Sequence, residues 1–217
     1  MKVVVFGATG MIGQGVLREC LQDKRIDSVR TVGRRKTGAA HSKLTELERD
    51  DLYTYAEGEF ADADACLFCL GVSSTGMSEA AYTRITYDLT MAAAKAFRPG
   101  ATFIYVSGVG TNEQGRQMWA RVKGRTEREL LESQTNAYMF RPGYIQPVHG
   151  ERSRTRLYNA LYVIAKPLYP VLKRLAPGAV TTTEAIRKAM IKVALSGYPK
   201  KILEPKDINA AAELSDH

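Results

Sequence analysis

The first fifteen residues constrain the fold more than any other part of the chain. Residues 2–6 form an uninterrupted β-branched and aromatic run, which is typical of a parallel strand buried on both faces. Three glycines follow at once, Gly7, Gly10 and Gly13, and after them an apolar pattern with helical spacing extends to about Gln22. This order predicts a strand, a glycine-rich turn and a helix packed against that turn.

The glycine-rich turn has the chemistry of a dinucleotide-binding site. Gly7 allows a tight turn, Gly10 lets a diphosphate approach the backbone N–H groups, and Gly13 lets the helix pack closely. The start of the helix also offers unpaired N–H groups and a partial positive charge to the phosphates. A turn that binds nothing is the alternative interpretation. The residues expected at the dinucleotide are Gly7, Thr9, Gly10, Met11, Ile12 and Gly13.

A second apolar run at residues 28–32 predicts the next strand, which ends at Gly33. A site that prefers NAD usually carries an acidic residue here, to bind the ribose 2′-hydroxyl. This chain instead has Arg34, Arg35 and Lys36. A guanidinium group suits a 2′-phosphate. We therefore expect NADP(H) as the cofactor, bound by both arginines, with NAD less favoured; a solvated basic turn is the alternative.

The rest of the chain alternates strand and helix patterns. Further strands are expected at 44–47, 63–70, 101–107, 137–141 and 201–203, with helices at 79–97 (capped by Ser78), 115–132 and, after a capping box at Thr181 and Glu184, to about Leu195. Residues from Asn209 onward are expected to be frayed. This alternation predicts an α/β fold, a Rossmann doubly wound parallel sheet with helices on both faces. We expect a single domain over 1–217, with a cofactor-binding core at 1–145 and a C-terminal substrate or lid segment at 146–217.

Length and composition are those of a soluble globular protein. The 217 residues are 45% hydrophobic and 25% charged. No apolar run reaches the roughly 18 residues of a membrane span, and the sequence starts without an apolar signal region. The odd number of cysteines argues against a disulfide framework and fits a reducing compartment. We therefore expect a cytoplasmic protein.

Cys66 and Cys69 have the spacing of a redox or metal-binding pair. They fall inside an expected strand, where residues three apart point to opposite faces. Both are therefore expected to be core residues. The three histidines have no ligand spacing, so no metal site is expected.

Residues 152–175 combine apolar side chains at helical spacing with six basic residues, more than half of the net charge of +8. The favoured interpretation is a small helical lid over the substrate cleft. The alternative is an interfacial helix that makes weak contact with an anionic membrane surface. Anionic partners are expected near this segment. Nucleic acid is not, because no basic patch interleaved with aromatic residues forms a known recognition motif.

Several short motifs occur together in a characteristic order: the glycine turn at 7–13, Gly33-Arg34-Arg35, Cys69-Leu70-Gly71, Tyr105-Val106-Ser107, Val122-Lys123-Gly124 and Phe140-Arg141-Pro142-Gly143. As a set they resemble the atypical branch of the short-chain dehydrogenase/reductase superfamily, the NAD(P)-binding, nucleoside-diphosphate-sugar-epimerase-like branch. The resemblance covers residues 1–145 well and the remainder loosely. It implies that Leu70, Gly71, Lys123 and Pro142 also contribute to cofactor binding.

The resemblance also implies an active site made of a serine after the fifth strand and a Tyr-x-x-x-Lys motif on the next helix. Ser107 and Lys123 match, but Trp119 occupies the tyrosine position. An indole N–H cannot accept a proton, and the loss of general acid–base catalysis typically costs about 10²–10⁴-fold. Tyr144 and His149 are candidate replacements, although each is better interpreted as a structural side chain.

Two function hypotheses follow. The first is an NADP(H)-dependent oxidoreductase or epimerase-like enzyme with an altered acid and base, acting on a small molecule. The second is a non-catalytic NADP(H)-binding redox-sensing or regulatory protein. Ser107 and Lys123 favour the first, whereas Trp119 favours the second. The substrate and the oligomeric state are not predicted by the sequence.

Overall fold

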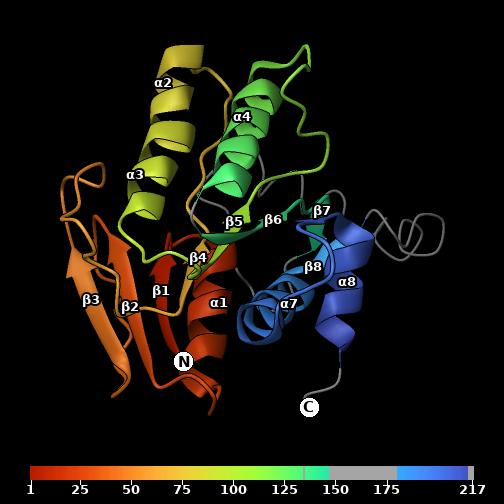
Figure 1. Ribbon diagram of the computed structural model, residues 1–217. Coiled ribbons are helices and arrows are strands. Elements are labelled where there is room, and N and C mark those ends of the chain that lie inside the picture. Colours follow the sequence, from red (N-terminus) through yellow and green to blue (C-terminus); the bar gives the residue numbers. More distant parts are fainter. Residues whose placement is uncertain (134, 147–179, 215–217) are drawn as a thin grey trace.

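The computed structural model describes residues 1–133, 135–146 and 180–214 (Figure 1). The strands are β1 (Lys2–Phe6), β2 (Ser28–Gly33), β3 (Leu44–Glu48), β4 (Ala65–Phe68), β5 (Thr102–Val106), β6 (Asn136–Phe140), β7 (Tyr144–Gln146), β8 (Val180–Thr182) and β9 (Ile202–Leu203). The helices are α1 (Met11–Gln22), α2 (Glu79–Thr83), the π-helical segment η1 (Arg84–Asp88), α3 (Leu89–Lys95), α4 (Met118–Glu132), α7 (Thr183–Ser196) and α8 (Pro205–Glu213).

Seven strands form one parallel sheet in the order β3-β2-β1-β4-β5-β6-β9. The order reverses between β1 and β4, which is the switch point of a doubly wound sheet. The register brings Phe6 opposite Val32 and Phe68, and Phe68 opposite Tyr105. The strands therefore end at a common edge, and the expected Rossmann-type α/β fold is confirmed.

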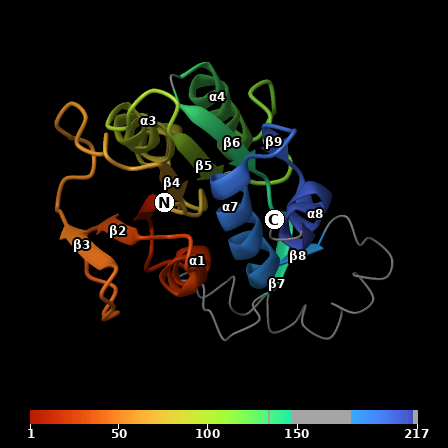
Figure 2. The same cartoon turned by 60° about the horizontal axis from the view of Figure 1, so that its bottom comes forward.

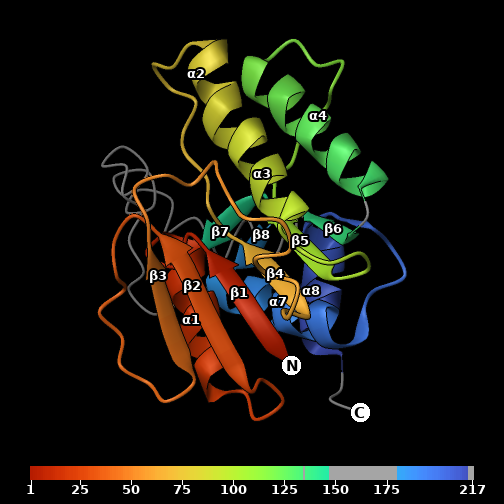
Figure 3. The ribbon, with the colours of Figure 1, turned by 60° about the vertical axis from the view of Figure 1, so that its left-hand side comes forward.

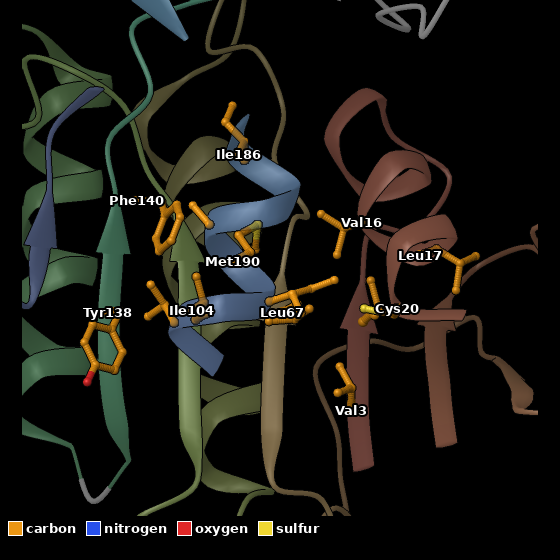
Figure 4. Close-up of a cluster of buried hydrophobic side chains, with 14 of the residues drawn as sticks. Val3, Val16, Leu17, Cys20, Leu67, Ile104, Tyr138, Phe140, Ile186 and Met190 are labelled. Atoms are coloured by element: carbon orange, nitrogen blue, oxygen red, sulfur yellow. The ribbon is translucent and has the colours of Figure 1, made fainter. Parts of the chain in front are cut away.

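Helices cover both faces of this sheet, and alternating strand residues divide between the two cores (Figure 3). On one face, α1 and α7 pack over side chains that include Val3, Leu67 and Ile104 (Figure 4). On the other face, α3 and α4 pack over a set that includes Phe6, Phe68 and Tyr105. Period-two alternation of this kind is what a strand buried on both sides requires.

The two cysteines of the C-x-x-C spacing lie in different cores. Cys66 belongs to the core under α3 and α4, whereas Cys69 packs against the core under α1 and α7. Their expected placement on opposite faces is confirmed. Burial raises the pKa of the Cys66 thiol, which keeps it protonated and unreactive.

The end of the chain differs from the expectation. Residues from Asn209 onward were expected to be frayed, but α8 continues to Glu213. Its start is fixed by a reciprocal pair, in which Glu204 caps the helix and the Asp207 carboxylate accepts from the Glu204 N–H at 3.2 Å. Ile208 is fully buried, so packing holds the helix as well.

The start of α7 also differs by one residue. Its capping residue is Thr182, whose hydroxyl accepts from the Ala185 N–H at 3.0 Å, rather than Thr181. Thr181 belongs instead to β8, which pairs with β7 to form a separate two-stranded sheet beside α7 and α8 (Figure 2). Neither β7 nor β8 was expected. The segment 152–175, expected to form a lid or an interfacial helix, is not among the described residues.

A buried ion pair joins α1 to α7 and so connects the helix that follows the glycine turn to the C-terminal part of the chain. Arg187 Nε lies 2.6 Å from Glu19 Oε2, and the Arg187 side chain is only 8% exposed. Glu19→Gln removes the 2.6 Å carboxylate partner of this buried guanidinium, which keeps a longer 3.9 Å contact with Glu184, so we expect the free energy of unfolding to fall by about 2 kcal/mol. Urea unfolding measures this loss.

The control is Lys188→Gln, which removes the exposed ion pair between Lys188 and Glu184 on the same helix. Exposed pairs contribute little, so a loss of about 0.5 kcal/mol or less is expected. Equal losses in the two variants would contradict a stabilising role for the buried pair.

Candidate functional site

The loops that follow β1, β2, β4, β5 and β6 meet at the carboxyl edge of the sheet. Backbone hydrogen bonds continue the ladder past the last strand residues, from Cys69 N–H to Phe6 O at 3.0 Å and from Ser107 N–H to Phe140 O at 2.7 Å. The edge is where ligands bind in open α/β sheets. The motifs expected to bind the cofactor and the substrate are therefore brought together here.

The glycine turn after β1 is too tight for side chains. Gly7 has φ +73°, and a Cβ built there would lie 2.6 Å from the backbone nitrogen of Leu70. A Cβ on Gly13 would lie 2.1 Å from the Gly7 carbonyl oxygen. Gly10 is less crowded, with its nearest contact at 3.2 Å. The turn thus needs glycine at positions 7 and 13 to bring α1 against the end of β1.

The start of α1 presents its backbone N–H groups at this edge. The capping residue is Gly10, which supplies no side-chain acceptor, and the first turn of the helix contains no acidic residue. Thr9, Met11 and Ile12 are half-buried around it. A helix start with these features suits an anionic group, because its N–H groups and dipole are not used by a side chain of the cap. The turn therefore fits a diphosphate.

Arg34 and Arg35 extend from the end of β2 and are exposed. Within the described part of the chain, neither makes an ion pair with an acidic residue. The nearby Glu46 on β3 accepts a hydrogen bond from the Thr37 N–H at 2.7 Å and so holds the loop that carries the arginines. Two positive charges thus face solvent on the β2 side of the glycine turn.

Ser107 follows β5 directly and is buried. Its Oγ lies 3.0 Å from Oγ1 of Thr111, and that hydroxyl in turn donates to the Gly108 carbonyl oxygen at 2.7 Å. Pro142, which follows β6, accepts from the Val109 N–H at 3.1 Å and fixes the same loop. The loop after β5 is therefore held in place on both sides.

Lys123, on α4, reaches back to the end of β5. Its Nζ donates to the Val106 carbonyl oxygen at 3.3 Å and lies 5.4 Å from the centre of the Tyr105 ring. Burial lowers the pKa of its ammonium group from 10.5 to about 8, although Glu127 opposes the shift. A lysine in this state exchanges its proton near neutral pH.

Trp119 lies one helical turn before Lys123 and is half-buried. A Cβ built on Gly110 would lie 3.5 Å from Cη2 of the indole, so the ring packs on the loop after β5. Ser107, Trp119 and Lys123 are thus gathered around one loop. Tyr144 lies at the start of β7, where its hydroxyl donates to Gln146 at 3.1 Å. His149 falls in the part of the chain that the structure does not describe.

A buried ion-pair network supports α4 behind the lysine. Glu127, only 3% exposed, accepts from Arg141 Nε at 2.9 Å, and Arg141 also reaches Glu204 at 3.1 Å. Both carboxylates raise the pKa of Arg141, with Glu127 the stronger influence. The network ties α4 to the end of β6 and to the start of α8.

Two residues at this site were missed by the sequence analysis. Glu127 follows Lys123 by four positions, a helical spacing that indicated a shared face. Thr111 carried no such signal, because its contact with Ser107 depends on the path of an irregular loop. Leu70, which packs against Gly7, and the exposed Gly71 lie at the same edge, as expected.

Comparison with protein-family models finds no match. Among named proteins, the chain is similar to Protein FMP52, mitochondrial, of Meyerozyma guilliermondii, with 27% identity over 95% of this chain and 90% of that protein. Protein fmp52, mitochondrial, of Aspergillus fumigatus is 27% identical over 89% of this chain and 87% of its own length. Because these relatives are named mitochondrial proteins, the expected cytoplasmic location is contradicted.

Solved structures identify the fold. An oxidoreductase of the short-chain dehydrogenase/reductase family from Burkholderia thailandensis has a TM-score of 0.67 at 17% identity and covers 97% of this chain and 92% of its own. A UDP-glucuronic acid 4-epimerase from Bacillus cereus, in complex with NAD, has a TM-score of 0.66 at 11% identity and covers 94% of this chain and 76% of its own. The chain therefore has the short-chain dehydrogenase/reductase and sugar-epimerase-like fold.

Proposed function

We propose that this protein is an NADP(H)-dependent oxidoreductase or epimerase-like enzyme that acts on a small molecule. The observation that carries the proposal is the convergence, at one sheet edge, of a glycine turn that excludes side chains and a lysine whose pKa is lowered to about 8. The first feature suits a dinucleotide, and the second suits proton transfer. The NAD held by the epimerase of similar fold supports a nicotinamide dinucleotide.

Each part of the cofactor has residues suited to it. The start of α1 suits the diphosphate, and Arg34 and Arg35 suit a 2′-phosphate through charge-assisted hydrogen bonds. Leu70 and Gly71 follow β4 and Pro142 follows β6, so all three lie at this sheet edge, and Lys123 suits the hydroxyl groups of the nicotinamide ribose. When bound, the nicotinamide supplies or accepts the hydride, so that it is oxidised while a substrate carbonyl is reduced, or the reverse.

Trp119 supports a second function, that of a non-catalytic NADP(H)-binding protein which senses the redox state. An indole at this position cannot exchange a proton with the substrate oxygen. This alternative shares the cofactor site of the first proposal and differs only in lacking turnover.

The two functions are separated by measuring NADPH oxidation with a panel of aldehydes and ketones. We expect turnover by the wild-type protein and a gain in rate for Trp119→Tyr, which restores a hydroxyl four residues before Lys123. Tight NADPH binding by the wild-type protein without turnover of any carbonyl would support the sensor and contradict the enzyme.

A further inference from the structure

The hydrogen bond between the Ser107 and Thr111 hydroxyl groups at the end of β5 has a defined direction. Thr111 has one hydroxyl proton, and it is directed to the Gly108 carbonyl oxygen, which can only accept. The 3.0 Å contact between Ser107 and Thr111 must therefore use the Ser107 proton. It follows that the lone pairs of Ser107 Oγ remain available to accept a proton or a hydrogen bond.

Lys123 is a cation close to this end of β5, and strand alternation puts it on the same side as Ser107. Side chains two apart on an extended chain share a face, so Ser107 points to the side of Tyr105. The Lys123 ammonium group lies over the Tyr105 ring and donates to the carbonyl of Val106, the residue bonded to Ser107. Strand alternation therefore places the ammonium group and the serine hydroxyl on the same side of β5.

The groups around Lys123 give its ammonium group a pKa of about 8, so that the charged and the neutral amine are both populated near neutral pH. Glu127 on α4 favours the charged amine, but its carboxylate is already bound by Arg141 at the end of β6. Tyr105 on β5 is a buried phenol, and burial raises its pKa and keeps it protonated. Because the Glu127 carboxylate is bound by Arg141, desolvation is the larger influence on the pKa of the lysine.

We propose that Lys123 is the acid and base of the reaction and exchanges its proton with the substrate oxygen through the Ser107 hydroxyl, in place of the absent tyrosine. This rests on the proposed oxidoreductase function. In the reductive direction, the carbonyl carbon gains a hydride, and its oxygen takes the Ser107 proton as that O–H turns away from Thr111. The serine oxygen takes a proton from Lys123 Nζ, and the neutral amine regains one from water. The oxidative direction reverses every transfer.

The first test needs neither substrate nor turnover. In cofactor-free protein with ¹³C-labelled lysine ε-carbons, the Lys123 resonance, assigned with Lys123→Arg, should titrate near pH 8. Lys200, whose ammonium is held by Asp207 at 2.6 Å with a raised pKa, is the internal control and should titrate at higher pH. Ser107→Ala removes an acceptor for the charged amine, so it should move the Lys123 midpoint to lower pH.

A Lys123 midpoint at the ordinary value of 10.5 would overturn this proposal and would also remove the lysine from the observation that carries the proposed function. A lowered midpoint that Ser107→Ala leaves in place would overturn this proposal alone.

The second test uses turnover. Lys123→Arg keeps a cation at the cofactor but holds its proton too tightly to release it, so kcat for reduction should fall by about 10²–10⁴-fold with NADPH binding retained. The wild-type rate of reduction should decline as pH rises through about 8, because the neutral amine has no proton to give. Lys200→Arg is the matched control and should keep the wild-type rate.

The results separate the two claims. A wild-type protein that binds NADPH and reduces no carbonyl would remove the proposed function, and this inference with it. An active wild-type protein whose Lys123→Arg variant keeps its rate would overturn this inference alone.

Discussion

Gly13→Ala is expected to weaken the binding of a nicotinamide dinucleotide by about 100-fold, or ~2.7 kcal/mol. The added methyl group would lie 2.1 Å from the Gly7 carbonyl oxygen and 2.8 Å from its carbonyl carbon. Backbone atoms cannot move aside as a flexible side chain can, so α1 has to shift away from the turn. The shift separates the N–H groups of the helix from the diphosphate, and isothermal titration calorimetry with NADPH measures the loss.

The control for this substitution is Gly33→Ala, at the end of β2. Its nearest neighbour, the Arg35 carbonyl oxygen, is 3.8 Å from the new methyl group, which is an ordinary contact. Binding should stay within about threefold of the wild type. If Gly13→Ala also binds within this range while remaining folded, the dinucleotide is not bound at the glycine turn.

Replacing both Arg34 and Arg35 with glutamine is expected to raise the Kd for NADPH by about 100-fold and to leave that for NADH within about threefold. The two guanidinium groups are exposed and unpaired among the described residues, so the substitution disrupts no internal ion pair. Only a ligand with a 2′-phosphate loses charge-assisted hydrogen bonds. The ratio of the two dissociation constants therefore isolates the contribution of the arginines.

The matched control is the double variant Lys24→Gln and Lys206→Gln, which removes the same charge from two exposed positions on other elements. It should not change the ratio. Equal weakening of NADPH and NADH by the arginine variant would contradict recognition of the 2′-phosphate. A loss of NADPH affinity in the lysine control as well would point to a general effect of net charge.

The fold follows closely from local patterns in the sequence. The central strands of the large sheet are short apolar runs, whereas the edge strand β3 combines leucines with polar residues. The glycine spacing at 7–13 predicted the turn because steric exclusion of a Cβ is a property of the residue itself. The positions of Ser107 and Lys123 followed from the resemblance, and helical spacing placed Trp119 one turn before the lysine.

Features that depend on distant contacts were not predictable in this way. β7 and β8 are three residues long and more than thirty residues apart in sequence, so neither has a period that identifies it. The helix α8 begins at a glutamate cap, which is not among the usual capping residues, and its stability depends on burial against α7. The π-helical segment η1 within the helix after β4 has no distinguishing residue pattern.

Dependence on contacts distant in the sequence also explains why the environments of Ser107 and Lys123 were not predicted. The hydrogen bond from Ser107 to Thr111, and hence the direction of the serine proton, depends on a loop whose path no local rule specifies. The pKa of Lys123 depends on how completely α4 and β5 exclude water from its amine. Sequence supplied the residue types, whereas the tertiary structure supplied the environment that gives them their chemistry.

The central claim is that the carboxyl edge of the sheet holds a nicotinamide dinucleotide between the glycine turn and the two arginines. A crystal structure of the protein with NADPH tests it most directly. We predict the diphosphate within hydrogen-bond distance of the backbone N–H groups of Met11 and Ile12, and the 2′-phosphate against Arg34 and Arg35. A diphosphate bound elsewhere, or a 2′-phosphate directed away from both arginines, would contradict the account.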